Sequence, residues 1–226
     1  MSKKSNPKKI KYENPNFQIE LNQEQREARE KILQNDISIL IGKSGSGKTL
    51  LACSVSLEQY LNKKIEKIVI TRPTVTKEEL GFLPGTIDEK MDPWISPIYA
   101  NMYQLLPKDV IQRMVIDNVL EISPISYMRG RTFLNSIIIV DEIQNLINGQ
   151  LEMVVQRLGK DSKMILCGDI AQIDLKNEKT SSIHYINGMD DIKGICIIEL
   201  KSNHRHPILD EVLDFFKKQK NKLSSN

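Results

Sequence analysis

The feature that most constrains this chain is a glycine-rich octapeptide, GKSGSGKT at 42–49, which fits the pattern GxxxxGK[ST]. It follows a β-branched apolar run at Ile37–Ile41 and precedes a stretch with helical spacing at Lys48–Leu61. The glycines of such a loop let backbone N–H groups wrap around phosphates, and the following helix adds partial positive charge. We therefore expect a nucleoside triphosphate to bind at Gly42, Lys43, Ser44, Gly45, Ser46, Gly47, Lys48, Thr49 and Leu50.

The rest of the chain alternates short apolar runs with longer helical stretches. The other runs lie at Ile65–Ile70, Val119–Ile122, Ile137–Val140, Met164–Cys167 and Ile195–Ile198. Near-continuous apolar strands with long connections are typical of a parallel sheet covered on both faces, so we expect a three-layer α/β fold. Helices are expected at Leu21–Gln34, with Asn22 as its N-cap, and at Ile87–Leu106, Gln150–Leu158 and Ile208–Lys218.

Charge is distributed unevenly along the 226 residues, which carry 32 Lys+Arg and 29 Asp+Glu. Residues 1–12 hold five lysines and residues 217–222 hold four, so the remainder has 23 basic against 29 acidic residues. We expect a basic tail at 1–16, one domain at 17–216 and a second basic tail at 217–226. Such tails are more often solvated termini than contacts to nucleic-acid phosphate.

Several kinds of site and location are excluded by what the sequence lacks. The cysteines show no CxxC spacing and the histidines have no partners at zinc-site spacing, so we expect buried thiols and no structural zinc. These residues are Cys53, Cys167, Cys196, His184, His204 and His206. No signal segment and no membrane-length apolar run is present, which predicts a soluble, cytoplasmic protein without membrane contact.

An acidic pair follows the apolar run at Ile137–Val140. A loop of the kind at 42–49 places its lysine on the β- and γ-phosphates and its threonine hydroxyl on Mg²⁺, which assigns these roles to Lys48 and Thr49. Hydrolysis needs a carboxylate for the metal and a group that activates water. We assign Asp141 to Mg²⁺ and Glu142 to the catalytic base, although an acidic pair after a strand can also cap a helix.

A third strand end carries Gly168-Asp169-Ile170-Ala171-Gln172. A Gly-Asp turn after a strand is common, so this motif alone is weak. It is the third strand end that faces one nucleotide, and we therefore interpret Gln172 as a γ-phosphate sensor that orients the attacking water.

Arginine is scarce, because only eight of the 32 basic residues are arginines. Arginine is favoured where a planar contact to phosphate is needed. Arg205 is the candidate arginine finger, and Arg72, Arg129 and Arg131 are candidates for holding a nucleic-acid backbone, with Tyr127 placed to stack on a base. Surface salt bridges are the alternative for each arginine.

Taken together, these motifs resemble the PhoH-like family of P-loop ATPases, which is similar to the first motor domain of superfamily 1 helicases. The resemblance runs from about Leu21 to Pro207 and rests on GKSGSGKT at 42–49, TRP at 71–73, GFLPG at 81–85, YMRGRT at 127–132, IIIVDEIQN at 137–145 and GDIAQID at 168–174. It implies a single RecA-like ATPase domain with a role in RNA metabolism.

The resemblance also implies roles for individual residues. It places Lys48, Thr49, Asp141 and Glu142 where the motifs themselves place them, and it implies that Gln172 and Arg205 contact the γ-phosphate. It further implies that Gln25 reads the adenine edge, although a solvated glutamine would give the same pattern. Departures from the family pattern are Lys43 and Ser44 in the loop, DEIQ in place of DEAQ, and a loose match before Pro207.

Two functional hypotheses follow, with a third that is weaker. The first is an ATPase with Mg²⁺ that is coupled to RNA or single-stranded DNA. The second is a module that assembles under ATP control with little turnover, and the third is a small-molecule kinase, which the acidic pair and Gln172 disfavour. Because a lone motor domain must obtain its finger arginine from somewhere, we also expect a homo-oligomer, with a hexameric ring favoured and ATP at its interfaces.

Overall fold

The computed structural model describes residues 19–73, 87–175 and 177–204, together with residues 208–209, 211–212, 215–216 and 219. The described positions from 208 onward are helical, as expected for the stretch at Ile208–Lys218. The predicted tail at 1–16 lies outside the described residues, and so does Arg205.

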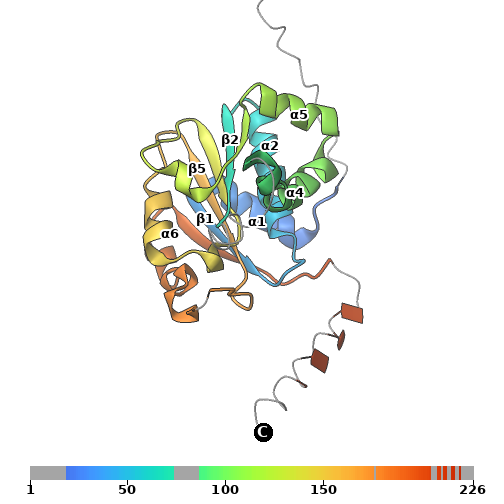
Figure 1. The fold of residues 1–226 in the computed structure, drawn as a ribbon, viewed down its shortest axis with the longest axis vertical. Helices are drawn as coiled ribbons and strands as arrows, with labels where there is room; N and C mark the ends of the chain where they lie inside the picture. Colours follow the sequence, from blue (N-terminus) through green and yellow to red (C-terminus); the bar gives the residue numbers. More distant parts are fainter. Residues whose placement is uncertain are drawn as a thin grey trace, which may run out of the picture.

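Six parallel strands form one sheet in the order β3-β2-β4-β5-β1-β6 (Figure 1). Each strand lies within two residues of a predicted apolar run. Their bounds are β1 Ile37–Gly42, β2 Lys67–Thr71, β3 Leu120–Ile122, β4 Ser136–Val140, β5 Lys163–Gly168 and β6 Ile195–Leu200. The three-layer α/β fold predicted from the sequence is confirmed.

The predicted helices are present, with the one expected at Gln150–Leu158 shifted to Asn148–Val155, whereas α5 and the short 3-10 helices were not predicted. The α-helices are α1 Gln23–Gln34, α2 Lys48–Leu61, α4 Ile87–Leu105, α5 Lys108–Ile116 and α6 Asn148–Val155. Short 3-10 helices lie at η1 Ile125–Met128, η2 Ile143–Asn145, η3 Glu178–Thr180, η4 Ser182–Tyr185 and η5 Met189–Asp191. The sequence analysis missed α5, which begins directly after Pro107.

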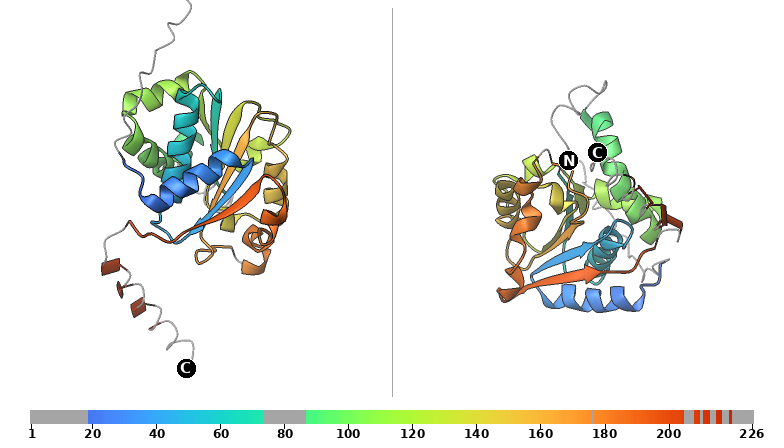
Figure 2. Two further views of the ribbon diagram at one scale, coloured as in Figure 1. Left: turned by 180° about the vertical axis from the view of Figure 1, so that it is seen from behind. Right: turned by 90° about the horizontal axis from the view of Figure 1, so that it is seen from below.

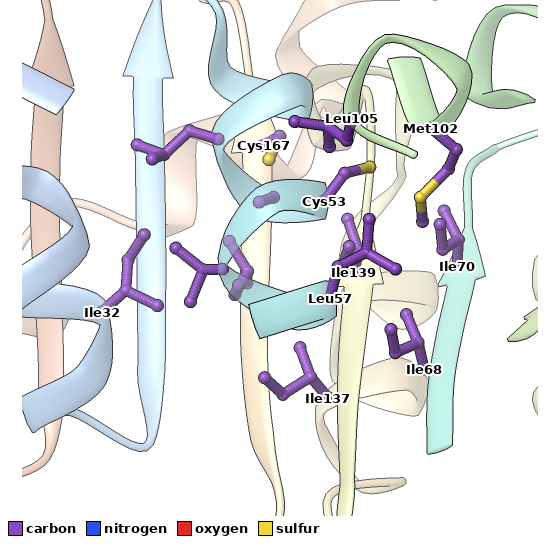
Figure 3. Packing of buried hydrophobic residues seen from close by; sticks show 14 of the residues in the cluster. Ile32, Cys53, Leu57, Ile68, Ile70, Met102, Leu105, Ile137, Ile139 and Cys167 are labelled. Carbon is purple, nitrogen blue, oxygen red and sulfur yellow. The ribbon is translucent and has the colours of Figure 1, made fainter. Parts of the chain in front are cut away.

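The sheet is apolar on both faces, because alternate residues of each strand enter different cores. On one face, Ile137 and Ile139 belong to a core that also holds residues of α1, α2, α4 and α5, and Figure 3 shows Cys53 and Leu57 of α2 beside Ile137 and Ile139 of β4. On the other face, Ile138 belongs to a second core that includes residues of α6 and of the 3-10 helices. The two helical layers are seen on opposite sides of the sheet in Figure 2.

Because helices cover both faces of the sheet, polar side chains can gather only at its edges. All strands are parallel, so their carboxyl ends share one edge, where ligands of open α/β sheets bind. Within the sheet, β5 lies between β1 and β4. The loop after β1 and the acidic pair after β4 therefore flank the turn that follows β5.

The cysteines differ from one another in burial. Cys53 and Cys167 are fully buried, and this burial raises the pKa of both thiols. Cys196 is only partly buried, which corrects the expectation that all three are buried. It lies on β6, the last strand of the sheet among the residues that the structure describes.

None of the helices among the described residues combines the length and the hydropathy that a membrane crossing requires.

One half-buried ionic cluster joins the edge strand β3 to its neighbour. The Glu121 carboxylate accepts two hydrogen bonds from the Arg131 guanidinium, at 2.5 and 2.8 Å, and lies 2.7 Å from Lys67 Nζ. The guanidinium also lies 4.6 Å from the centre of the Phe133 ring. The hydrogen bond from Arg131, followed by the contact with Lys67, lowers the pKa of Glu121 from 4.5 to about 2.

We expect Glu121→Gln to lower the free energy of unfolding by about 2 kcal/mol at pH 7, measured by urea denaturation. The folded pKa lies below the unfolded one, so the contribution is present above pH 4.5 and is lost as the pH falls towards 2. The difference between variant and wild type should therefore shrink below pH 4.5. Glu199→Gln is the matched control, because Glu199 and Lys201 form an exposed pair. Equal losses in the two variants would contradict the prediction.

Candidate nucleotide site

In the loop after β1, the side chain of Lys48 forms hydrogen bonds with the backbone of the same loop. Lys48 Nζ donates to the carbonyl oxygens of Gly42 at 2.7 Å and Lys43 at 3.0 Å. Gly47 has a φ of 83°, in the left-handed region, and a Cβ at this position would lie 2.8 Å from Gln25 Nε2. Only glycine meets both conditions without strain. The loop therefore has the wrapped backbone that a phosphate-binding loop needs.

The end of this loop meets the acidic strand end. Thr49 Oγ1 donates to Asp141 Oδ1 at 2.8 Å, although the two residues are 92 positions apart in the sequence. Asp141 is 7% exposed, and burial, followed by the nearby Glu142, raises its pKa. A hydroxyl and a carboxylate are oxygen ligands of the kind that Mg²⁺ prefers. The oxygen ligands of this pair and the desolvated charge of Asp141 fit a magnesium ion.

A buried hydroxyl without a partner lies in the same loop. Ser46 is 2% exposed, and its Oγ has no hydrogen-bond partner within the described structure. Such groups are rare in folded proteins and need an explanation. A ligand of the loop would supply the missing partner.

Glu142 is held on both sides of its carboxylate. Its Oε2 accepts a hydrogen bond from Gln144 Nε2 at 2.5 Å, and its Oε1 lies 3.8 Å from the Arg72 guanidinium. Its backbone is left-handed, with a φ of 55°, which is uncommon for a residue with a side chain and often occurs at functional sites. The sequence analysis did not single out Gln144, although it is fully buried.

The turn after β5 lies against the loop after β1. Asp169 Oδ2 accepts a hydrogen bond from Ser44 N at 2.7 Å, and Asp169 N donates to Gln144 Oε1 at 3.0 Å. Gln172 follows on the same turn and has an exposed side chain. Gln172 thus lies on the turn that contacts the loop, and the contact itself is made by Asp169.

Gln25 lies on the other side of the loop. It is 4% exposed, so the alternative of a solvated glutamine is wrong. Its Oε1 accepts a hydrogen bond from Asn22 N at 3.1 Å, and its backbone N donates to Asn22 Oδ1 at 2.8 Å, which confirms Asn22 as the N-cap of α1. Its Nε2 lies 3.4 Å from His204 Nε2.

His204 is a neighbour of the loop that the sequence analysis considered only for zinc. Its backbone N donates to the Gly45 carbonyl at 3.1 Å. The preceding residues are fixed by Glu24, whose carboxylate accepts hydrogen bonds from Lys201 N and Ser202 N. The Ser202 side chain, followed by the Lys201 backbone, lowers the pKa of Glu24. The segment at 201–204 is therefore held by hydrogen bonds to α1 and to the loop at 42–49.

The candidate nucleic-acid residues do not form one group. Arg72 lies beside Glu142, whereas the Arg131 guanidinium is paired with Glu121 on the strand β3. Tyr127 is 61% exposed and Arg129 is also exposed. The structure therefore separates Arg72 from Arg131, and it favours the salt-bridge alternative for Arg131.

Comparison with known proteins identifies a family. A sequence model of the family described as PhoH-like protein matches residues 19–217. A PhoH-like protein of Synechocystis is 36% identical over 201 residues, which is 87% of this chain and 61% of the relative. A PhoH-like protein of Bacillus subtilis is 40% identical over 199 residues, which is 86% of this chain and 62% of the relative. The chain thus spans about three fifths of the length of these relatives.

Solved structures with a similar arrangement have low sequence identity. A Pif1 helicase from Candida albicans has a TM-score of 0.41 and 16% identity, covering 82% of this chain and 40% of the other. The SWI2/SNF2 ATPase core of Sulfolobus solfataricus, solved in complex with double-stranded DNA, has a TM-score of 0.46 and 14% identity, covering 83% and 46%.

The family model covers most of the chain, and two relatives share more than a third of their aligned residues with it. The three-layer α/β fold with six parallel strands agrees with this match. This chain belongs to the PhoH-like protein family.

Proposed function

We propose that this protein binds ATP with Mg²⁺ and hydrolyses it, and that single-stranded nucleic acid, RNA in the first instance, controls the rate. The observation that carries the proposal is the 2.8 Å hydrogen bond from Thr49 to Asp141, which joins the phosphate-binding loop to the acidic strand end. Glu142 is the adjacent residue. A phosphate-binding loop, a metal-binding pair and a base thus lie at one edge of the sheet.

Each residue has a distinct part in this reaction. Lys48, now bonded to carbonyl oxygens of its own loop, would turn to the β- and γ-phosphates. Thr49 and Asp141 would hold Mg²⁺, which neutralises phosphate charge when bound. Glu142 would take a proton from the attacking water, and Gln172 would orient that water.

The adenine ring of the nucleotide would lie beside α1 and the segment that follows β6. A glutamine amide matches the N6 and N7 edge of adenine. Gln25 lies next to Gly47, so an adenine beside the loop is within its reach. This position supports ATP as the nucleotide.

Arg72 offers a physical route from nucleic acid to hydrolysis. It lies directly after β2 and 3.8 Å from the Glu142 carboxylate. A nucleic-acid phosphate that binds Arg72 would draw it away from Glu142 and leave this carboxylate free to act as a base. Exposed Tyr127 and Arg129 would add stacking and charge contacts.

Assembly under ATP control remains the alternative function. A finger arginine could come from Arg205 of the same chain, which lies outside the described residues, or from a neighbouring copy of the chain. Sedimentation with and without ATP measures this function separately from turnover. Oligomerisation by ATP without hydrolysis would favour the alternative.

We expect Glu142→Gln to lower the steady-state rate of ATP hydrolysis about 100-fold or more, while ATP binding changes little, because the amide cannot accept a proton. Turnover is measured by phosphate release with Mg²⁺, and binding by fluorescence of a labelled ATP. Glu152→Gln, at an exposed position of α6, is the matched control and should turn over like wild type. A Glu142→Gln variant that keeps half of the wild-type rate would exclude Glu142 as the base.

We expect Arg72→Ala to abolish most of the acceleration by single-stranded RNA, because the contact that couples the RNA to Glu142 is removed. The measured quantity is the ratio of hydrolysis rates with and without oligouridylate. Arg113→Ala is the control, since Arg113 lies on α5 and pairs with Asp117. An unchanged ratio in the Arg72 variant would refute the coupling route.

A further inference from the structure

Asp169 is a buried carboxylate to which the proposed hydrolysis assigns no part. It is 5% exposed and follows β5, the strand between β1 and β4. Its Oδ2 accepts the hydrogen bond from Ser44 N at 2.7 Å, and its Oδ1 accepts one from Ala171 N at 2.9 Å. Each carboxylate oxygen therefore has its own backbone donor.

The bond to Ser44 is unusual because of where it lies. Backbone N–H groups of the loop at 42–49 are the donors that such loops offer to phosphate anions. One of these donors is already used by an anion of the protein itself. Ser44 was expected among the phosphate-binding residues, but its N–H holds the loop to the turn after β5.

A second link leads from Asp169 to the proposed base. Asp169 N donates to Gln144 Oε1 at 3.0 Å, and Gln144 Nε2 donates to Glu142 Oε2 at 2.5 Å. A backbone N–H can only donate, so the amide oxygen of Gln144 must face Asp169. The NH₂ group is then directed at Glu142, and the amide cannot flip without losing both bonds.

The surroundings of Gln144 fix it further. Its side chain is fully buried, and its backbone carbonyl accepts a hydrogen bond from Ser181 Oγ at 2.6 Å. Buried polar networks with every member satisfied are rigid. A displacement of the loop at Ser44 would therefore reach Glu142 through two hydrogen-bonded residues.

We propose that Asp169 and Gln144 are positioning residues, which tie the phosphate-binding loop to Glu142 so that the base is aligned only when the loop is in its wrapped form. The inference rests on the proposed function, because it assigns Glu142 the role of base. Neither residue touches the nucleotide in this proposal. Asp169 acts on the loop through Ser44 N, and Gln144 acts on the Glu142 carboxylate.

The test is Asp169→Asn, which has nearly the same shape. The asparagine has one acceptor oxygen, so its NH₂ group would face either Ser44 N or Ala171 N, and both of these are donors. We expect kcat for ATP hydrolysis to fall 10- to 100-fold while KM changes less than about 3-fold. A loss of folded protein would also lower the apparent kcat at constant KM, so kcat is expressed per ATP-binding site, counted by titration with labelled ATP.

Asp174→Asn is the matched control on the same turn. Asp174 is exposed and its Oδ2 is bonded to Asn145 Nδ2 at 3.3 Å, so the charge change is the same but the loop is not involved. It should retain wild-type kcat and KM. An unchanged kcat in Asp169→Asn would overturn the proposal. Tighter ATP binding would also overturn it, because Asp169 would then compete with phosphate.

A measurement on the wild-type protein covers the case in which the variant does not fold. Amide hydrogen exchange followed by NMR should find the Ser44 N–H protected about 100-fold or more without nucleotide, and still protected when ATP with Mg²⁺ is added. Rapid exchange in either state would overturn the link to Asp169. If wild type binds but does not hydrolyse ATP, the proposed function fails, and this exchange still reports on the Ser44 to Asp169 contact.

Discussion

The burial of both faces of the sheet is the constraint on which the rest of the structure depends. Each strand sends apolar side chains into two separate cores, so polar chemistry is restricted to the edges of the sheet. Since all six strands are parallel, the carboxyl edge collects the residues that follow every strand. The loop at 42–49, Asp141 and Asp169 meet there although they are far apart in the sequence.

Buried carboxylates at this edge are stabilised in two different ways. Asp169 has two backbone N–H donors and is already satisfied within the protein. Asp141 has a hydroxyl donor and an acidic neighbour, and its pKa is raised. Burial and the charge of Glu142 outweigh the favourable contacts of Asp141, so a cation bound at this carboxylate would stabilise its charged form. This difference separates the proposed metal ligand from the proposed positioning residue, and the two have the same side chain.

The sequence predicts the parts of this fold that depend on local patterns. The strands are apolar runs, α2 begins at Lys48 and ends at Leu61 as expected, and Asn22 caps α1. The helix α5 was missed because Pro107 allows either a loop or a helix start, although Val110, Ile111 and Met114 recur at helical spacing within it.

Contacts between distant residues could not be predicted in the same way. The bond from Ser44 to Asp169 spans 125 positions and uses a backbone N–H, which no side-chain motif records. Gln144 was quoted within a motif, but its role depends on two partners that only the sheet order brings together. The available signal was a glutamine placed two positions after the acidic pair.

The arginines show why residue type alone does not identify a site. The small number of arginines in the chain made Arg72 and Arg131 equal candidates for a phosphate contact. In the structure each of them is paired with a glutamate. Arg131 makes two short hydrogen bonds with Glu121, in a cluster that also holds Lys67 and lies against the Phe133 ring, so removing it would cost stability. Arg72 has a single long contact of 3.8 Å with Glu142. A weak ion pair is easily exchanged for a phosphate, whereas a bidentate pair is not. The geometry of the pairing therefore makes Arg72 the arginine suited to a regulated contact.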